Sequence, residues 1–289
     1  MIKKQGFETL DIIITIVLLF LTALILIPFL NILAITLATN REYLNTRFFL
    51  FPRSPTFENY IRIIEDGRIF YGFRTTLVYV ILGVPLNLFL TVTMAYGLSR
   101  LNFPGGKFIF FAILITLLFN GGIIPMYLLM MQLGLIGSIW SVILITGINT
   151  FLMIITRTYF TTIPDSLIES AKIDGAGEWK ILFKVILPLS MPIIATITLF
   201  YTVDRWNEWF FSMIFIRSNF IIPLQLFIRN IAVDSNILTT INVTGDEEVR
   251  IADGMRMASV VLSMIPIFCL FPFLQRYFVK GVMIGAIKA

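Results

Sequence analysis

The sequence predicts an all-α integral membrane protein with six transmembrane helices. The 289-residue chain is 58% hydrophobic and only 13% charged, and its mean hydropathy is +0.92. Soluble domains average about 25% charged and 45–50% apolar residues. In addition, the apolar residues form six separate windows, and a helix needs about 20 such residues to cross a bilayer.

The six windows are separated by basic or loop-forming residues. The first follows Lys3 and Lys4 and is longer than the apolar core of a cleaved signal peptide, so we expect it to be retained. Prolines inside several windows predict kinks. The windows cover residues 10–37, 75–98, 108–133, 135–156, 189–203 and 257–275.

Residues 209–228 are apolar enough to be considered as a seventh span. Arg217 near the middle would be costly in lipid, and Pro223 would interrupt the helix. We therefore expect an outer, interfacial segment. The choice matters because a seventh crossing would reverse the side of the C-terminus.

Six spans place both chain ends on one side of the membrane. Lys and Arg are equally numerous in the two sets of loops, so their bias is weak, but Lys3, Lys4 and the short turn before Lys107 favour a cytoplasmic N-terminus. We expect a multi-pass protein of the plasma membrane with both termini cytoplasmic. Its parts are an N-terminal segment, a transmembrane domain and a tail, covering residues 1–9, 10–280 and 281–289.

Composition limits the chemistry of this chain. It has no histidine and a single cysteine, Cys269, in an apolar stretch. Zinc hydrolysis, a disulfide framework and His-based nucleophilic catalysis are therefore not expected. The formal charge of +5 comes from basic residues scattered between apolar blocks, which argues for lipid and against nucleic acid as a partner. We expect no catalytic residue, metal or cofactor.

The long insert on the expected cytoplasmic side, residues 157–188, has the pattern of two short helices. Pro164 suits a first helical turn and Gly175 is a natural C-terminal stop. Beyond it, apolar residues recur at i, i+3, i+4 and i+7, which predicts an amphipathic helix that ends at Pro188. These residues are Trp179, Leu182, Phe183 and Ile186.

Such a hairpin can rest on the lipid surface or bind a protein, and the residues alone leave both interpretations open. The first helix carries Asp165, Glu169 and Asp174, which an anionic inner leaflet would repel. Small residues with carboxylates are better suited to a protein partner, where arginine is the natural counterpart.

The insert from Tyr159 to Pro188 resembles the EAA loop of ABC importer permeases, which reads E-A-A-x-x-x-G, nine residues, then I-x-L-P. Here Ser170 replaces the first alanine and Val185 the isoleucine, while the glycine and the spacing match. Other segments resemble carbohydrate permeases of the maltose-permease-like, LplC-type branch. They are F-N-G-G-I-I-P from Phe119, W-N-E-W from Trp206, P-L-Q from Pro223 and the ending from Phe278 to Ala289.

The resemblance implies a type I ABC importer permease fold that forms half of the path for a sugar or oligosaccharide. It also implies several partners: a second homologous permease, two ATP-binding subunits that hold ATP and Mg²⁺, and an extracellular solute-binding protein or lipoprotein. Residues 234–254 would reach the binding protein, and the tail would touch the ATPases.

The same resemblance implies that the loop contains a coupling helix that docks in a cleft of the ATPase. Glu169 would face a basic group there, Ala171 would permit close packing and Gly175 would allow a sharp turn. The implied coupling residues are Glu169, Ser170, Ala171, Asp174, Gly175 and Ala176.

A gradient-driven secondary transporter of small solutes is the alternative. Ion or proton coupling usually needs charged residues within the membrane, and we expect none in the middle of the six spans. The chain also lacks a G-x-x-x-x-G-K-[ST] loop, because the run from Pro104 to Lys107 is too short to cradle phosphates. The energy source is therefore expected on a partner.

Substrate contact is expected from aromatic and amide side chains in the outer half of the protein, because sugars stack on rings and bind amides. The competing interpretation is that Trp and Tyr gather at membrane interfaces regardless of function. Likewise, Asn87 within a span can serve helix packing. The candidates are Asn120, Tyr201, Trp206, Asn207 and Trp209. The identity, length and charge of the sugar do not follow from the sequence.

Overall fold

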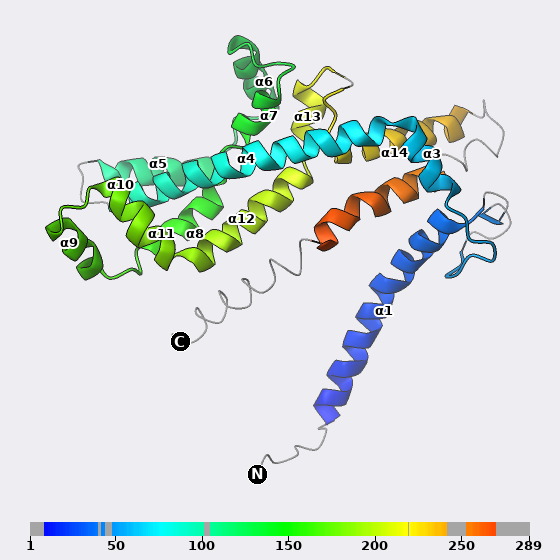
Figure 1. The fold of residues 1–289 in the computed structure, drawn as a ribbon, viewed down its shortest axis with the longest axis horizontal. Helices are drawn as coiled ribbons and strands as arrows, with labels where there is room; N and C mark the ends of the chain where they lie inside the picture. Colours follow the sequence, from blue (N-terminus) through cyan, green and yellow to red (C-terminus); the bar gives the residue numbers. More distant parts are fainter. Residues whose placement is uncertain are drawn as a thin grey trace. The chain divides into compact units, whose positions relative to one another are not determined.

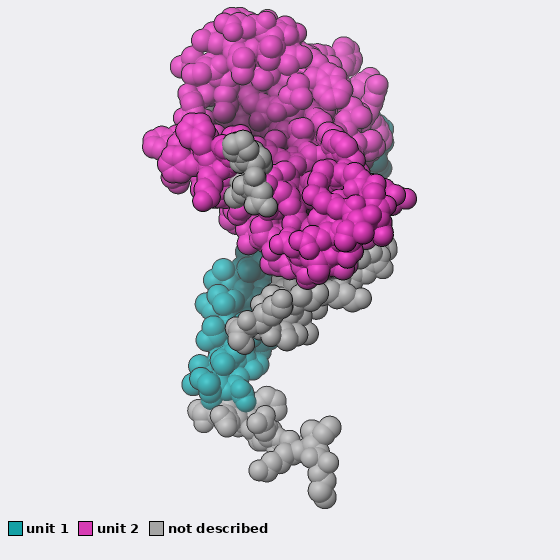
Figure 2. Space-filling view, turned by 90° about the vertical axis from the view of Figure 1, so that its left-hand side faces the viewer, with its two compact units in different colours: residues 1–69, 228–264 teal, residues 70–227, 265–289 magenta. Residues whose placement is uncertain are grey.

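A computed structural model describes residues 9–39, 42–43, 48–100, 105–218, 220–241 and 253–269, and the regular structure in these ranges is entirely helical (Figure 1). Internal contacts divide the chain into two compact units (Figure 2). Unit 1 comprises residues 1–69 and 228–264, and unit 2 comprises residues 70–227 and 265–289.

Unit 1 contains the first predicted span. Helix α1 (Thr9–Leu37) is long and apolar enough to cross a membrane, as the sequence predicts. Most of its large apolar side chains are exposed, which is typical of a helix surrounded by lipid or by another apolar chain. Helix α3 (Glu58–Asp66) is attached to the end of α1, because Asn59 and Tyr60 donate hydrogen bonds to Thr36.

The sixth predicted span is only partly described. Residues 253–269 are helical, so the helix begins four residues before the predicted window, and the remainder of that window lies outside the described residues. Helix α14 (Leu224–Ile241) begins in unit 2 and continues into unit 1. The N-terminal residues 1–8, most of the predicted binding-protein loop and the tail at 281–289 also lie outside the described residues.

Helix α4 (Arg68–Ser99) is the second predicted span and the long element of unit 2. It begins seven residues before the predicted window. Pro85 lies inside it without ending it. In Figure 1, α4 lies beside α12 (Met191–Trp206), and side-chain hydrogen bonds join the two helices.

The third and fourth windows are not continuous helices, which corrects the prediction. The third is divided into α5 (Gly106–Leu118) and α6 (Ile123–Gln132), bent by 116°. The fourth is divided into α7 (Ile139–Ile145) and α8 (Thr150–Phe160), bent by 50°. In the first break, Gly122 has φ +84°, a backbone conformation that glycine adopts without strain.

The fifth window also differs from its predicted bounds of 189–203. Helix α12 continues to Trp206. The preceding helical run does not end at Pro188; it continues to Leu189 and bends by 87° into α12. Pro188 lies in α11 (Leu187–Leu189), directly after a π-helical turn and before the bend into α12.

The described residues contain two helices that qualify as spans by length and hydropathy, or five spans if each bent pair counts as one. Residues 209–228 do not form one helix, in agreement with the sequence. Helix α13 covers only Phe210–Phe215, and Arg217 and Pro223 fall in the link before α14.

The core of unit 2 lies between α4, α8, the helical run after Gly177 and α12. That run consists of α10 (Glu178–Ile181), a π-helical turn (Leu182–Ile186) and α11. Buried residues from all four parts form one apolar cluster, including Ala95, Met153, Phe160, Ile186 and Ile197. This cluster packs α8 against α4 and α12.

Candidate functional site

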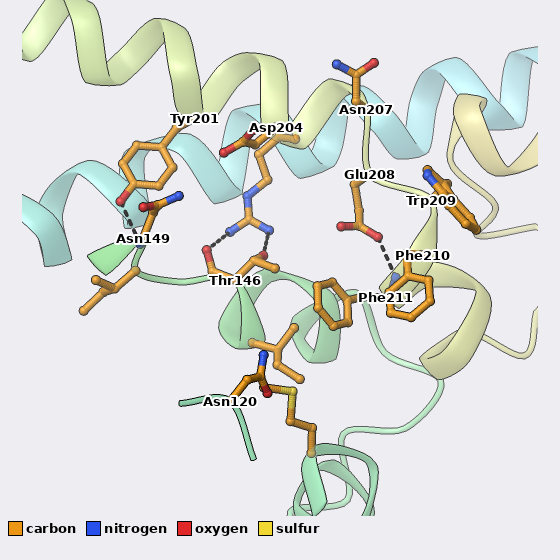
Figure 3. A pocket seen from close by; sticks show the side chains of 14 residues that line it. Asn120, Thr146, Asn149, Tyr201, Asp204, Asn207, Glu208, Trp209, Phe210 and Phe211 are labelled. Atoms are coloured by element: carbon orange, nitrogen blue, oxygen red, sulfur yellow. Dashed lines mark hydrogen bonds between the residues drawn. The ribbon is translucent and has the colours of Figure 1, made fainter. Parts of the chain in front are cut away.

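A cavity of about 480 Å³ lies in unit 2 beside the link between α7 and α8 (Figure 3). Its lining comes from the break before α6, from the α7–α8 link, and from the last turns of α12 with the start of α13. Three amides line it, Asn120, Asn149 and Asn207, and so do four aromatic residues, Tyr201, Trp209, Phe210 and Phe211.

Four of the five side chains predicted to contact substrate lie together in this lining: Asn120, Tyr201, Asn207 and Trp209. Trp206 does not line the cavity. It is 3% exposed, and its ring packs near Phe73 with centroids 6.4 Å apart. Contact of the four residues with a substrate stays a prediction.

Side chains of α4 and α12 hold the α7–α8 link in place. Asn87 donates from Nδ2 to two carbonyl oxygens of the link at 2.7 and 2.8 Å. The Tyr201 hydroxyl accepts from the backbone N–H of Asn149 at 3.0 Å and lies 2.6 Å from Thr91 Oγ1. Non-helical backbone at membrane depth is tolerated only where protein buries it or where it lines a cavity. Both conditions apply to this link.

Arg205 of α12 makes the most extensive polar contacts in the site. Its Nε and Nη2 donate to Asn87 Oδ1 at 3.0 and 2.9 Å. Nη2 also donates to the carbonyl oxygens of Ile143 and Thr146, and Nη1 donates to the Val142 carbonyl and the Thr146 hydroxyl. These carbonyls belong to the C-terminal end of α7, where a positive charge stabilises the helix dipole.

The surroundings of Arg205 differ from those that its place after the predicted fifth span suggests. Its side chain is 3% exposed, and it meets Asn87, which lies in the middle third of α4. The sequence places Arg205 just after the fifth span, in water. Instead, amide and carbonyl oxygens replace the water around the guanidinium, which makes its burial tolerable.

Two carboxylates complete the charged lining. Glu208 Oε1 accepts from the backbone N–H groups of Phe211 and Ser212 at 2.8 and 3.2 Å, and thereby caps the start of α13. Asp204 lines the cavity, and in the part of the chain that the structure describes no hydrogen bond or ion pair reaches its carboxylate. The same described ranges contain no cluster of three or more metal-ligating residues.

The polar insert contains α9 (Asp165–Ile173), which begins directly after Pro164. Gly175 ends the helix with φ +73°. Its N–H donates to the Lys172 carbonyl at 3.0 Å and the N–H of Ala176 donates to the Ala171 carbonyl at 2.9 Å. These two bonds form a Schellman motif, whose glycine adopts the left-handed conformation. Gly175 is therefore the helix stop that the sequence predicts.

The residues implied to couple with an ATPase differ in exposure. Glu169, Ser170, Asp174 and Gly175 are exposed, whereas Ala171 and Ala176 are half-buried and pack against the core of unit 2. Ile173 is 87% exposed beside these acids. The insert thus presents one strongly exposed apolar side chain among carboxylates, on a helix that Ile168 anchors to the core.

Ion pairs fix the insert at both ends of α9. Arg100 Nη1, beyond the end of α4, lies 2.8 Å from Asp165 Oδ1, and Lys172 Nζ lies 2.8 Å from Glu178 Oε1. The predicted amphipathic second helix is present, but only part of its apolar face is buried. Leu182 and Ile186 are buried, whereas Trp179 and Phe183 are exposed and their rings stack with centroids 6.1 Å apart.

Comparisons with known proteins agree over most of the chain. A family profile described as "Binding-protein-dependent transport system inner membrane component" matches residues 7–284. Protein LplC of Bacillus subtilis (strain 168) is 35% identical over 266 residues, which cover 92% of this chain and 90% of the relative.

A second relative and a solved structure are described as parts of polysaccharide transporters. The polygalacturonan/rhamnogalacturonan transport system permease protein YtcP of Bacillus subtilis (strain 168) is 36% identical over 263 residues, covering 91% of this chain and 92% of the relative. A crystal structure of a bacterial ABC transporter involved in the import of the acidic polysaccharide alginate matches with a TM-score of 0.85 at 30% identity. That match covers 95% of this chain and 100% of the other.

Proposed function

This chain belongs to the family of binding-protein-dependent transport system inner membrane components, among the carbohydrate ABC importer permeases, and on that premise we propose that it forms half of the translocation path for a sugar or oligosaccharide. It is a multi-pass membrane protein, and we place both of its termini in the cytoplasm. The proposal has two parts, a substrate path and a coupling loop.

The cavity beside the α7–α8 link is the observation that carries the substrate path. Its volume of about 480 Å³ falls within the range of about 300–1,000 Å³ that is usual for small-molecule sites. Three separate segments contribute amide groups and aromatic rings to its lining. The amides can form hydrogen bonds with sugar hydroxyls, and the rings can stack on the sugar. Non-helical backbone is tolerated within a membrane where it lines a water-filled cavity, and such a cavity can admit a polar cargo where a continuous apolar helix could not.

The exposed face of α9 supports the coupling part of the proposal. Glu169 and Asp174 offer carboxylates to a basic partner surface, and Ile173 offers an apolar contact. The ion pairs of Arg100 and Lys172 connect α9 to α4 and α10. A displacement of α9 by a partner would therefore be transmitted to the helices that pack around the cavity. We propose that this loop docks on a cytoplasmic ATPase.

Two ATP-binding subunits would hold ATP and Mg²⁺, a second permease would complete the path, and an extracellular binding protein would deliver the cargo. The gradient-driven alternative is not favoured, because the family is served by binding proteins. The buried Arg205 does not revive that alternative, because all its donors are engaged by neutral oxygens.

Purification of the tagged chain in mild detergent is expected to recover an ATPase and a second permease in the same complex. The complex should hydrolyse ATP, and the chain expressed alone should not. A homo-oligomer of this chain that transports sugar without an ATPase would contradict the proposed partnership.

Replacing Trp209 with alanine is expected to raise the KM for sugar transport by about tenfold, because truncating an aromatic contact at the centre of a site typically removes more than about 1 kcal/mol of binding. Trp140 is a matched control, since it is similarly exposed but does not line the cavity. Transport into proteoliposomes measures both variants. Equal KM values for the two variants would argue against the cavity as the path.

A further inference from the structure

We propose that Asp204 makes this cavity select uncharged saccharides over saccharides that carry a ring carboxylate. The inference rests on the function proposed above and adds the substrate class. Some charged side chains of the lining are already bound by the protein, whereas others remain available to a ligand.

Among the described residues of the lining there is one cation, and its hydrogen-bond donors are fully engaged. It is Arg205, the only Lys or Arg that the structure describes there. A guanidinium has five N–H donors, and those of Arg205 are all taken up by Asn87 Oδ1, by the Thr146 hydroxyl and by carbonyl oxygens at the end of α7. The fork that would bind a sugar carboxylate in bidentate fashion is therefore occupied by the protein itself.

The available charge is negative. Glu208 uses Oε1 to cap α13. Asp204 has no hydrogen-bond or ion-pair partner among the described residues, and it lines the cavity together with Asn149, Asn207 and Tyr201 (Figure 3). A carboxylate accepts hydrogen bonds and donates none, so Asp204 is suited to the hydroxyl groups of a sugar.

A uronate unit would instead bring a second negative charge toward Asp204. Like charges repel, and the positive charge of Arg205 offsets that repulsion only in part, because Asp204, Glu208 and Arg205 together give the described lining a net charge of −1. Two similar proteins are named for the transport of polygalacturonan and of the acidic polysaccharide alginate, so the cargo of this chain would differ from theirs.

The test measures saccharide protection of a cysteine in the cavity. Ile148 is exposed and lines the cavity, so Ile148→Cys reports access, and Cys269→Ser removes the exposed native thiol. The importer is purified with its partner permease and ATPase but without the binding protein, whose own selectivity would otherwise enter the measurement. Maleimide labelling is followed with gluco-, galacto- and manno-configured trisaccharides and with the corresponding uronates, which differ by the carboxylates at C6.

With Asp204 present, at least one uncharged trisaccharide should protect at a concentration about tenfold or more below that of its uronate partner. Asp204→Asn should reduce that ratio to about threefold or less, since it removes the charge and keeps the shape. Glu65→Gln, the same change of charge outside the cavity lining, is the control and should keep the original ratio.

Each other outcome has a distinct meaning. Equal or stronger protection by the uronates overturns the inference and leaves the proposed function in place. A ratio that Asp204→Asn does not change overturns the role of Asp204. If none of the sugars protects, the cavity is not a saccharide path, and the proposed function fails with it.

Discussion

Replacing Arg205 with leucine is expected to destabilise unit 2 by about 3 kcal/mol or more, because several buried acceptors lose their donors together. The guanidinium serves Asn87 Oδ1 and the carbonyl oxygens of Val142, Ile143 and Thr146. Water cannot readily replace it in a site where Arg205 is 3% exposed. The free carbonyls at the end of α7 would also lose the charge that stabilises the helix dipole.

Two further variants are expected to reduce the stability of unit 2 by smaller amounts. Arg205→Lys keeps the charge but offers three donors on a single nitrogen instead of a planar fork, so it should lie between the wild type and leucine. Gly83→Ala disturbs the same guanidinium from α4 without removing it, because an added Cβ would lie 2.6 Å from Arg205 Nε. Gly97→Ala is the matched control on the same helix, since its Cβ would meet nothing within 4 Å.

Thermal unfolding in detergent should give a Tm order of wild type and Gly97→Ala above Gly83→Ala and Arg205→Lys, with Arg205→Leu lowest. Transport should fall in the same order in variants that still insert, because the link that Arg205 fixes also lines the cavity. An unchanged Tm for Arg205→Leu would show that the hydrogen bonds around the guanidinium contribute nothing to stability.

The sequence predicts the existence of the apolar elements better than their continuity. The window at 10–37 coincides with α1 because length and hydropathy alone decide it. The window at 135–156 is equally apolar, yet the chain leaves the helix between Ile145 and Thr150. That break is held by hydrogen bonds that Asn87 donates to the link and that the Tyr201 hydroxyl accepts from it, and both residues are distant in sequence. Hydropathy contains no information about such partners.

The cavity could be predicted in part. Ring and amide chemistry identified Tyr201, Asn207 and Trp209, but Asp204 and Arg205 were assigned to water because charges normally end a span. Helical spacing offers a signal that could have found them, since residues 201, 204 and 205 follow the i, i+3, i+4 pattern of one face of α12. Asn149 had a weaker signal: with Gly147 it interrupts the apolar window, and its side chain caps α8 by accepting from the Leu152 N–H.

Replacing Gly175 with valine is expected to lower sugar-stimulated ATP hydrolysis and transport by about tenfold or more while leaving membrane insertion intact. Gly175 has φ +73°, and this left-handed region costs an L-residue about 1–2 kcal/mol, most for β-branched side chains. Relief of that strain would break the bonds that end α9 and turn the chain toward α10. The exposed face with Glu169 and Ile173 would then no longer be presented in one orientation.

Two substitutions separate backbone strain from contact with a partner. Gly177→Val adds the same side chain in the same loop, but Gly177 has φ −71° and open space around its Cβ position, so coupling should be largely retained. Gly175→Asn adds a side chain that tolerates the left-handed conformation.

The outcomes of these variants separate the two causes. Because a Cβ at Gly175 meets nothing within 4 Å in the described part of the chain, retained coupling in Gly175→Asn assigns the valine defect to the backbone. Loss of coupling in both Gly175 variants, with Gly177→Val active, assigns it to an ATPase surface packed against this turn. Full coupling in Gly175→Val would remove α9 from the coupling mechanism.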